Sequence, residues 1–117
     1  DWYETGNKML DGLHTAIINY PTSFANWAAL MIKQAYGINE IVITGKAYKE
    51  IRNSVLEHYM PDKILQCDSS ESNEFPLLKG KDYSADACVY LCKNYRCLPP
   101  CNTLEELLLL LKDLGNK

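Results

Sequence analysis

The chain has 117 residues, the size of one ordinary domain, and its hydrophobic content of 47% is enough for a packed core. The formal net charge is −3 and no basic stripe is present that would neutralise phosphates, so we expect no nucleic-acid partner. The longest apolar run, Leu107 to Leu111, is far shorter than the roughly 18 residues that a membrane helix needs, so we expect no membrane span.

Residues 1–37 predict a helical hairpin. Between Trp2 and Asn19, apolar residues recur at three- and four-residue steps, as on an amphipathic helix. Pro21 interrupts this helix, and a second helix with one apolar face follows it and ends at Gly37. Two helices do not bury two apolar stripes well by themselves, so we expect this pair to lie against the rest of the chain or against protein outside it.

Residues 38–117 predict a small α/β domain. A strand, a helix and a second strand follow one another within about 30 residues, and this order implies a parallel strand pair. With a third strand and a last helix, we expect a mainly parallel, three-stranded sheet with flanking helices. The expected elements are strands at Glu40–Thr44, Lys63–Cys67 and Ala87–Cys92, and helices at Lys46–Tyr59 and from Thr103 onward.

The last helix has an unusual distribution of leucines. Thr103 and Glu106 have the spacing of a capping box at its start. A helix with leucine on nearly every side is buried on more than one side, and in so short a chain this suggests a neighbouring domain that covers it. The leucines are Leu104, Leu107, Leu108, Leu109, Leu110, Leu111 and Leu114.

Four of the five cysteines lie between residues 88 and 101. The odd total argues against the disulfide framework of a small secreted protein, so we expect a reducing compartment and a cytoplasmic location. Asn94, between the second and third cysteines of this cluster, is expected to serve a turn.

Three interpretations of the cysteine cluster remain open. A zinc site would use all four thiolates, but C-x-x-C pairs are absent and Cys88 and Cys92 would lie about 13 Å apart on one strand. A redox site would use Cys92 and Cys97, which can meet across a turn and form a bond on oxidation. We favour the interpretation that the cysteines, Cys101 included, are buried and reduced and act as small apolar side chains, and we predict no metal and no cofactor.

A second candidate site is the turn Thr44-Gly45-Lys46, which lies between a predicted strand and a predicted helix. Free backbone N–H groups at such a helix start can bind phosphate. The glycine spacings of the known phosphate-binding loops are absent, so an ordinary strand–helix turn is the favoured interpretation.

The cysteine cluster also carries a resemblance to a known family. Residues 90–100, Y-L-C-K-N-Y-R-C-L-P-P, resemble the C-terminal end of the large thioredoxin-domain-containing proteins related to spermatogenesis-associated protein 20. The segments I-V-I-T-G at residues 41–45 and P-L-L-K-G-K at residues 76–81 also resemble this family in order and spacing. The residues that match its pattern Y-x-C-x-N-x-x-C-x-x-P are Cys92, Asn94, Cys97 and Pro100.

The resemblance implies that the chain is one piece of a larger protein. Members are similar in layout to a thioredoxin-like domain followed by an (α/α) toroid like that of six-hairpin glycosidases, with this tail at the end. Residues 1–37 would be the end of the toroid, and residues 38–117 a small α/β domain. The partners would be the remaining domains of the parent chain, or a second copy bound through exposed apolar helix faces.

The implied function is a non-catalytic C-terminal domain that packs on the toroid, so we do not expect this chain alone to be an enzyme. One alternative is that Cys92 and Cys97 contribute redox or substrate-site residues to the parent enzyme. A second alternative is phosphate or nucleotide binding at the turn of Thr44, Gly45 and Lys46.

Overall fold

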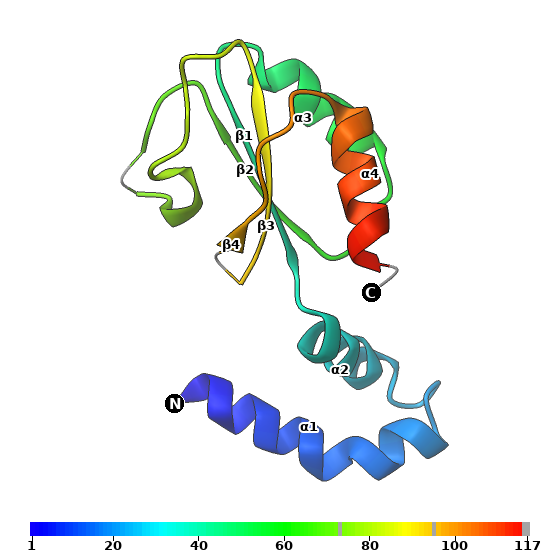
Figure 1. Cartoon of the computed structure of the whole chain (residues 1–117). Coiled ribbons are helices and arrows are strands. Elements are labelled where there is room, and N and C mark those ends of the chain that lie inside the picture. The colour runs from blue at the N-terminus through cyan, green and yellow to red at the C-terminus, as the bar shows by residue number, and fades with distance from the viewer. Residues whose placement is uncertain (73, 95, 116–117) are drawn as a thin grey trace. The chain divides into compact units, whose positions relative to one another are not determined.

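The computed structural model describes residues 1–72, 74–94 and 96–115. The chain divides into two compact units, Asp1–Gly37 and Ile38–Lys117. The α/β class and the N-terminal helix pair predicted from the sequence are confirmed. In chain order the elements are α1 (Trp2–Asn19), α2 (Ala25–Tyr36), β1 (Asn39–Thr44), α3 (Tyr48–Glu57), β2 (Lys63–Asp68), the short 3₁₀ helix η1 (Pro76–Leu78), β3 (Cys88–Lys93), β4 (Arg96–Cys97) and α4 (Leu104–Gly115) (Figure 1).

The first unit, Asp1–Gly37, is a pair of helices with little interior. In α1 only Leu10 and Ile17 are buried, and α2 has no buried residue. The side-chain amide of Gln34 near the end of α2 donates to Oδ1 of Asn7 near the start of α1 at 3.1 Å, as in an antiparallel pair. Many large apolar side chains of this unit are exposed, namely Trp2, Tyr3, Met9, Ile18, Tyr20, Leu30, Ile32 and Tyr36.

The second unit, Ile38–Lys117, is built on a mixed sheet with strand order β2-β1-β3-β4. β1 and β2 are parallel, as expected for a strand–helix–strand unit, but β3 is antiparallel to β1 and β4 is antiparallel to β3. The sheet therefore has four strands rather than three, and only one of its strand pairs is parallel. The reason is the connection from β2 to β3. Its described residues carry η1 and no crossover helix that would return the chain for a parallel strand.

One face of the sheet packs against both helices of this unit, α3 and α4. Figure 1 shows these two helices on the same side of the strands. Alternate residues of β1 and β3 point to this side because successive side chains of a strand point to opposite faces. The buried core here consists of Ile41 and Ile43 of β1, Val55 of α3, Val89 and Leu91 of β3, Cys101, and Leu107 of α4.

The opposite face of the sheet is covered by the β2–β3 connection instead of a long helix. Leu78 of η1 is buried there, with Leu77 and Ala85 packed around it. The strand residues on this face are Val42 of β1 and Cys88, Tyr90 and Cys92 of β3. This second, smaller cluster positions one end of the cysteine-rich segment.

The last helix is covered within its own unit to a greater extent than its leucines suggest. Leu107 is fully buried, and Leu104, Leu110, Leu111 and Leu114 pack against the core on the α3 side. Only Leu109, with 63% of its surface exposed, is a strongly exposed leucine of α4. The inference of a missing neighbour is therefore wrong for most of this helix, because α3 and the sheet together cover more than one of its sides.

Candidate functional site

The cysteine-rich segment closes β3 into a hairpin at the edge of the sheet. Cys92 lies opposite Cys97, and Lys93 lies opposite Arg96. The turn between them includes Asn94, whose φ of 51° lies in the left-handed region that asparagine tolerates. The predicted turn role of Asn94 is confirmed, while Tyr95 lies outside the described residues.

A disulfide joins Cys92 to Cys97. The neighbouring pair, Leu91 and Leu98, is joined through the backbone, because the N–H of Leu98 donates to the carbonyl of Leu91 at 2.9 Å. Hydrogen-bonded and non-hydrogen-bonded pairs alternate along an antiparallel ladder, so Cys92 and Cys97 form a non-hydrogen-bonded pair. Such pairs bring two strands closest together, and the Cα atoms here are 3.9 Å apart. The favoured expectation of reduced cysteines is wrong for this pair, because a short turn places the two directly opposite each other. The free cysteines are Cys67, Cys88 and Cys101.

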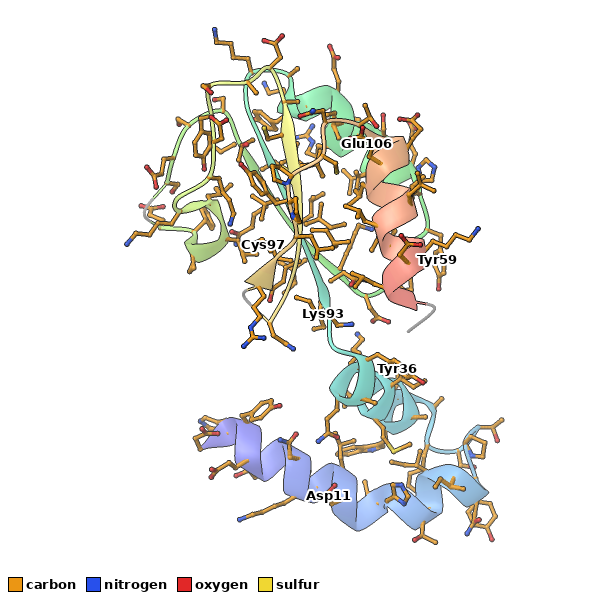
Figure 2. The ribbon with its side chains drawn as sticks, viewed as in Figure 1. Asp11, Tyr36, Tyr59, Lys93, Cys97 and Glu106 are labelled. Atoms are coloured by element: carbon orange, nitrogen blue, oxygen red, sulfur yellow. A yellow bond between two sulfur atoms is a disulfide. The ribbon has the colours of Figure 1, made fainter. Side chains whose placement is uncertain are left out.

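The two sulfur atoms of the disulfide have different surroundings. Cys92 is 1% exposed and belongs to the apolar cluster on the η1 face. Cys97 is exposed on the edge strand β4, where Figure 2 labels it. The ammonium group of Lys81 donates to Sγ of Cys97 at 3.2 Å and lies 5.1 Å from the ring centroid of Tyr90. One sulfur thus belongs to an exposed residue and lies next to a positive charge, and the other belongs to a buried residue.

Lys81 is held in place by the loop that contains it. The N–H of Asp82 donates to the hydroxyl of Tyr90 at 3.0 Å, which ties the loop to the face of β3 that carries Cys92. The carboxylate of Asp82 accepts from the hydroxyl of Ser84 at 2.6 Å and from its N–H at 2.8 Å, and these bonds lower the pKa of Asp82. The hydroxyl of Thr44 in β1 donates to the carbonyl of Asp82. The loop is therefore bonded to both β3 and β1 through Asp82, the residue directly after the lysine.

Pro100, which matches the family pattern, lies in an irregularity of the strand. Val89 and Cys101 exchange two backbone hydrogen bonds of 2.7 and 2.9 Å, and Leu98 bonds to Leu91. The two residue steps from Val89 to Leu91 on β3 therefore lie opposite the three residue steps from Leu98 to Cys101, as in a β-bulge. Pro99 and Pro100 lack N–H donors and occupy the positions between, where a ladder bond is not required.

The remaining two cysteines of the cluster are not positioned for a shared metal. Cys88 packs on the η1 face with Val42 and Tyr90, while Cys101 packs on the other face among the residues under α3 and α4. Burial, and then the charge of Glu106, raise the pKa of Cys101, which favours the protonated thiol. Among the described residues, no group of three or more possible metal ligands is assembled. The geometry therefore offers no four-cysteine zinc site.

The turn Thr44-Gly45-Lys46 is occupied by the chain itself. The carbonyl oxygens of Ala85 and Asp86 lie so close that a Cβ on Gly45 would be 2.6 Å from each of them. The N–H of Ala47, just before α3, donates to the carbonyl of Asp86 at 2.8 Å. A phosphate would meet these carbonyl oxygens at the helix start, so the geometry argues against a phosphate site at this turn.

Sequence reasoning missed two residues of the site, Lys81 and Tyr90. Tyr90 shares a face with Cys92 through the two-residue period of β3, which is a signal that the sequence contains. Lys81 lies in an irregular loop, and no periodic pattern relates it to a cysteine 16 positions later. The predicted residues Cys92, Asn94 and Cys97 come together in the hairpin, whereas Thr44, Gly45 and Lys46 belong to a separate turn.

Comparison with known proteins adds no relative, since no family, no curated protein and no solved structure matches the chain. Among the described residues, no helix combines the length and the apolar character that crossing a membrane requires.

Proposed function

We propose that this chain is a non-catalytic C-terminal domain of a larger thioredoxin-domain-containing protein and that its helical unit packs on the helical toroid of that protein. The observation that carries the proposal is the exposed apolar surface of α1 and α2. Trp2 is 92% exposed and Tyr36 is 72% exposed, although both are large and apolar enough to favour burial. The resemblance at residues 90–100 supplies the kind of partner.

The helical unit contrasts with the α/β unit in how its apolar residues are used. The sheet has a buried cluster on each face, so it supports itself. In α1 and α2, by contrast, only Leu10 and Ile17 are buried, and the many large apolar side chains that stay exposed favour an interaction with another protein surface. The proposal includes a cytoplasmic location, which the odd cysteine count supports.

A matched pair of leucine substitutions tests this proposal. Leu30 of α2 is 49% exposed and Leu56 of α3 is 57% exposed, and both lie on helices. In the complete polypeptide encoded by the reading frame that contains this chain, Leu30→Ser should destabilise the fold by about 1–3 kcal/mol, since its surface is covered there. Leu56→Ser is the control, and it should cost only the small helix-propensity term of about 0.5 kcal/mol.

Calorimetric unfolding of the two variants, each against the unsubstituted polypeptide, supplies the measurement. In the 117-residue chain alone the two substitutions should have similar small effects. Equal effects of both substitutions in the complete polypeptide, or a reading frame that encodes no helical toroid, would be evidence against the proposal.

A second candidate function is thiol–disulfide exchange at Cys92 and Cys97, and the disulfide itself is the observation that favours it. In a reducing compartment, disulfides are mostly transient and serve redox chemistry. An exposed sulfur beside a lysine is an environment in which cysteines react. The test is whether dithiothreitol reduces this bond, and removal of the reductant restores it, while the sheet stays folded by circular dichroism.

A further inference from the structure

We propose that Cys97 is the sulfur through which the Cys92–Cys97 pair exchanges with a dithiol, and that Lys81 is a positioning residue that stabilises the Cys97 thiolate. The proposal rests on the second candidate function above and specifies which of the two sulfur atoms the partner thiol attacks. It gives each sulfur a separate role: Cys97 forms the mixed disulfide with the partner, and Cys92 is the sulfur that leaves when this bond forms.

Accessibility assigns the attacked sulfur. A thiolate must approach a disulfide sulfur directly to displace the other sulfur. Cys92 is 1% exposed and is enclosed by Val42, Leu78 and Tyr90 on the η1 face, so a partner thiol has no approach to it. Cys97 is exposed on the two-residue strand β4. An incoming thiolate therefore reaches Cys97 and not Cys92.

Charge identifies the sulfur that is released as a thiolate when the mixed disulfide breaks. The ammonium group of Lys81 lies 3.2 Å from Sγ of Cys97 and donates a hydrogen bond to it. A neighbouring lysine stabilises a thiolate, and the thiolate is the reactive form of cysteine. Cys92 has the opposite environment, because it is buried in an apolar cluster, and burial in apolar surroundings disfavours a thiolate. A negative charge is thus favoured on Cys97, which makes Cys97 a good leaving group when the mixed disulfide breaks and the nucleophile of the reverse reaction. The choice of the attacked sulfur rests on accessibility.

Tyr90 connects the lysine to the strand that carries the disulfide. Its ring lies 5.1 Å from Nζ of Lys81, and its hydroxyl accepts from the N–H of Asp82, the next residue along the chain. Tyr90 and Cys92 are two positions apart on β3, so both lie on the η1 face. The lysine is therefore fixed at the sulfur by a buried aromatic side chain rather than held there by its own flexible stem alone.

The reduction of the pair by a dithiol balances as follows. A thiolate of the dithiol bonds to Sγ of Cys97, the Cys92–Cys97 bond breaks, and its electron pair goes to Sγ of Cys92, which takes up a proton. The second thiol of the dithiol loses its proton to solvent and bonds to the first sulfur of the dithiol. The mixed disulfide breaks, and its electron pair leaves on Cys97 as a thiolate beside Lys81. The dithiol is oxidised to a disulfide, and Cys92 and Cys97 are reduced.

Trapping with oxidised glutathione tests the assignment of the attacked sulfur. In the 117-residue chain, Cys92→Ser leaves Cys97 free, and Cys97→Ser leaves Cys92 free. Peptide mass spectrometry should find glutathione on Cys97 in the first variant and little or none on Cys92 in the second. Modification of Cys92 as fast as Cys97 would overturn the assignment.

A pair of lysine variants tests the role of Lys81. In the Cys92→Ser background, Lys81→Met removes the charge and keeps the apolar stem, and Lys79→Met is the control at an exposed lysine of the same loop. Loss of the lysine charge should lower the thiolate fraction of Cys97 about tenfold, but the more basic thiolate that remains is more nucleophilic. Alkylation of Cys97 by iodoacetamide should therefore be about threefold slower in Lys81→Met. Lys79→Met should leave the rate unchanged. Equal rates in the two variants would refute the role of Lys81.

Different results refute the role of Lys81 and thiol–disulfide exchange itself. If dithiothreitol reduces the Cys92–Cys97 bond in the folded chain but Lys81→Met has no effect, exchange stands and only the role of Lys81 is refuted. If the bond is reduced only when the sheet unfolds, thiol–disulfide exchange as a function is itself refuted.

Discussion

Gly45 is the residue whose identity the backbone restricts most closely. Its φ of +100° lies where side chains are strained, and a Cβ there would be 2.6 Å from the carbonyl oxygens of Ala85 and Asp86. The glycine lets the β2–β3 connection approach the end of β1 closely, which places Lys81 and Asp82 over the η1 face. The same close approach occupies the turn that the sequence offered as a phosphate site.

Gly45→Ala should therefore destabilise the α/β unit by about 3 kcal/mol, from backbone strain and from the displaced carbonyl oxygens together. Gly80→Ala is the matched control, because Gly80 also has a positive φ, +68°, but has open space where the Cβ would lie. It should cost about 1–2 kcal/mol, from strain alone. Urea unfolding followed by circular dichroism measures both, and equal costs would show that the close approach is not a real constraint.

Helix α4 shows which feature of an element a local sequence signal predicts. The predicted cap is present: the N–H of Glu106 donates to Oγ1 of Thr103 at 3.3 Å. In a capping box the carboxylate of Glu106 would accept from the N–H of Thr103. Here it accepts from the N–H of Asn102, one residue earlier, at 2.9 Å. The cap could be predicted because its partners lie within four residues of one another.

Thr103→Ala should cost about 1 kcal/mol, since it leaves the N–H of Glu106 without its side-chain acceptor. Thr103→Ser keeps the acceptor and should cost only a few tenths of a kcal/mol. The comparison by urea unfolding isolates the hydroxyl group, and an alanine variant as stable as the serine variant would mean that the cap contributes nothing.

The elements that depend on local patterns were predictable, and those that depend on pairing were not. α1 was predicted at its observed bounds, and β1 and β2 each within one residue at an end, because periodicity and β-branched residues mark them. β4 has two residues, too few to form a pattern, and the direction of β3 depends on where the β2–β3 connection lies. The sequence supports the disulfide only as one of three alternatives, since cysteine spacing does not fix the register of a hairpin.

For the molecule as a whole, the two units differ in how many of their own apolar side chains they bury. Ile38–Lys117 has a core on each face of its sheet, and most leucines of α4 are covered within it. Asp1–Gly37 has only two buried residues in its helices and many large exposed ones. Isolated helices of this length are marginal in water without tertiary packing, so the first unit is expected to be stabilised by protein outside this chain.

Amide hydrogen exchange of the 117-residue chain and of the complete polypeptide settles this point. In the isolated chain, the amides of α1 and α2 should exchange much faster than those of β1 and β3, because few contacts protect them. In the complete polypeptide, the α1 and α2 amides should become protected by at least about 1.4 kcal/mol, or tenfold slower exchange, while β1 and β3 change little. Unchanged exchange of α1 and α2 between the two proteins would mean that nothing outside this chain covers the helical unit.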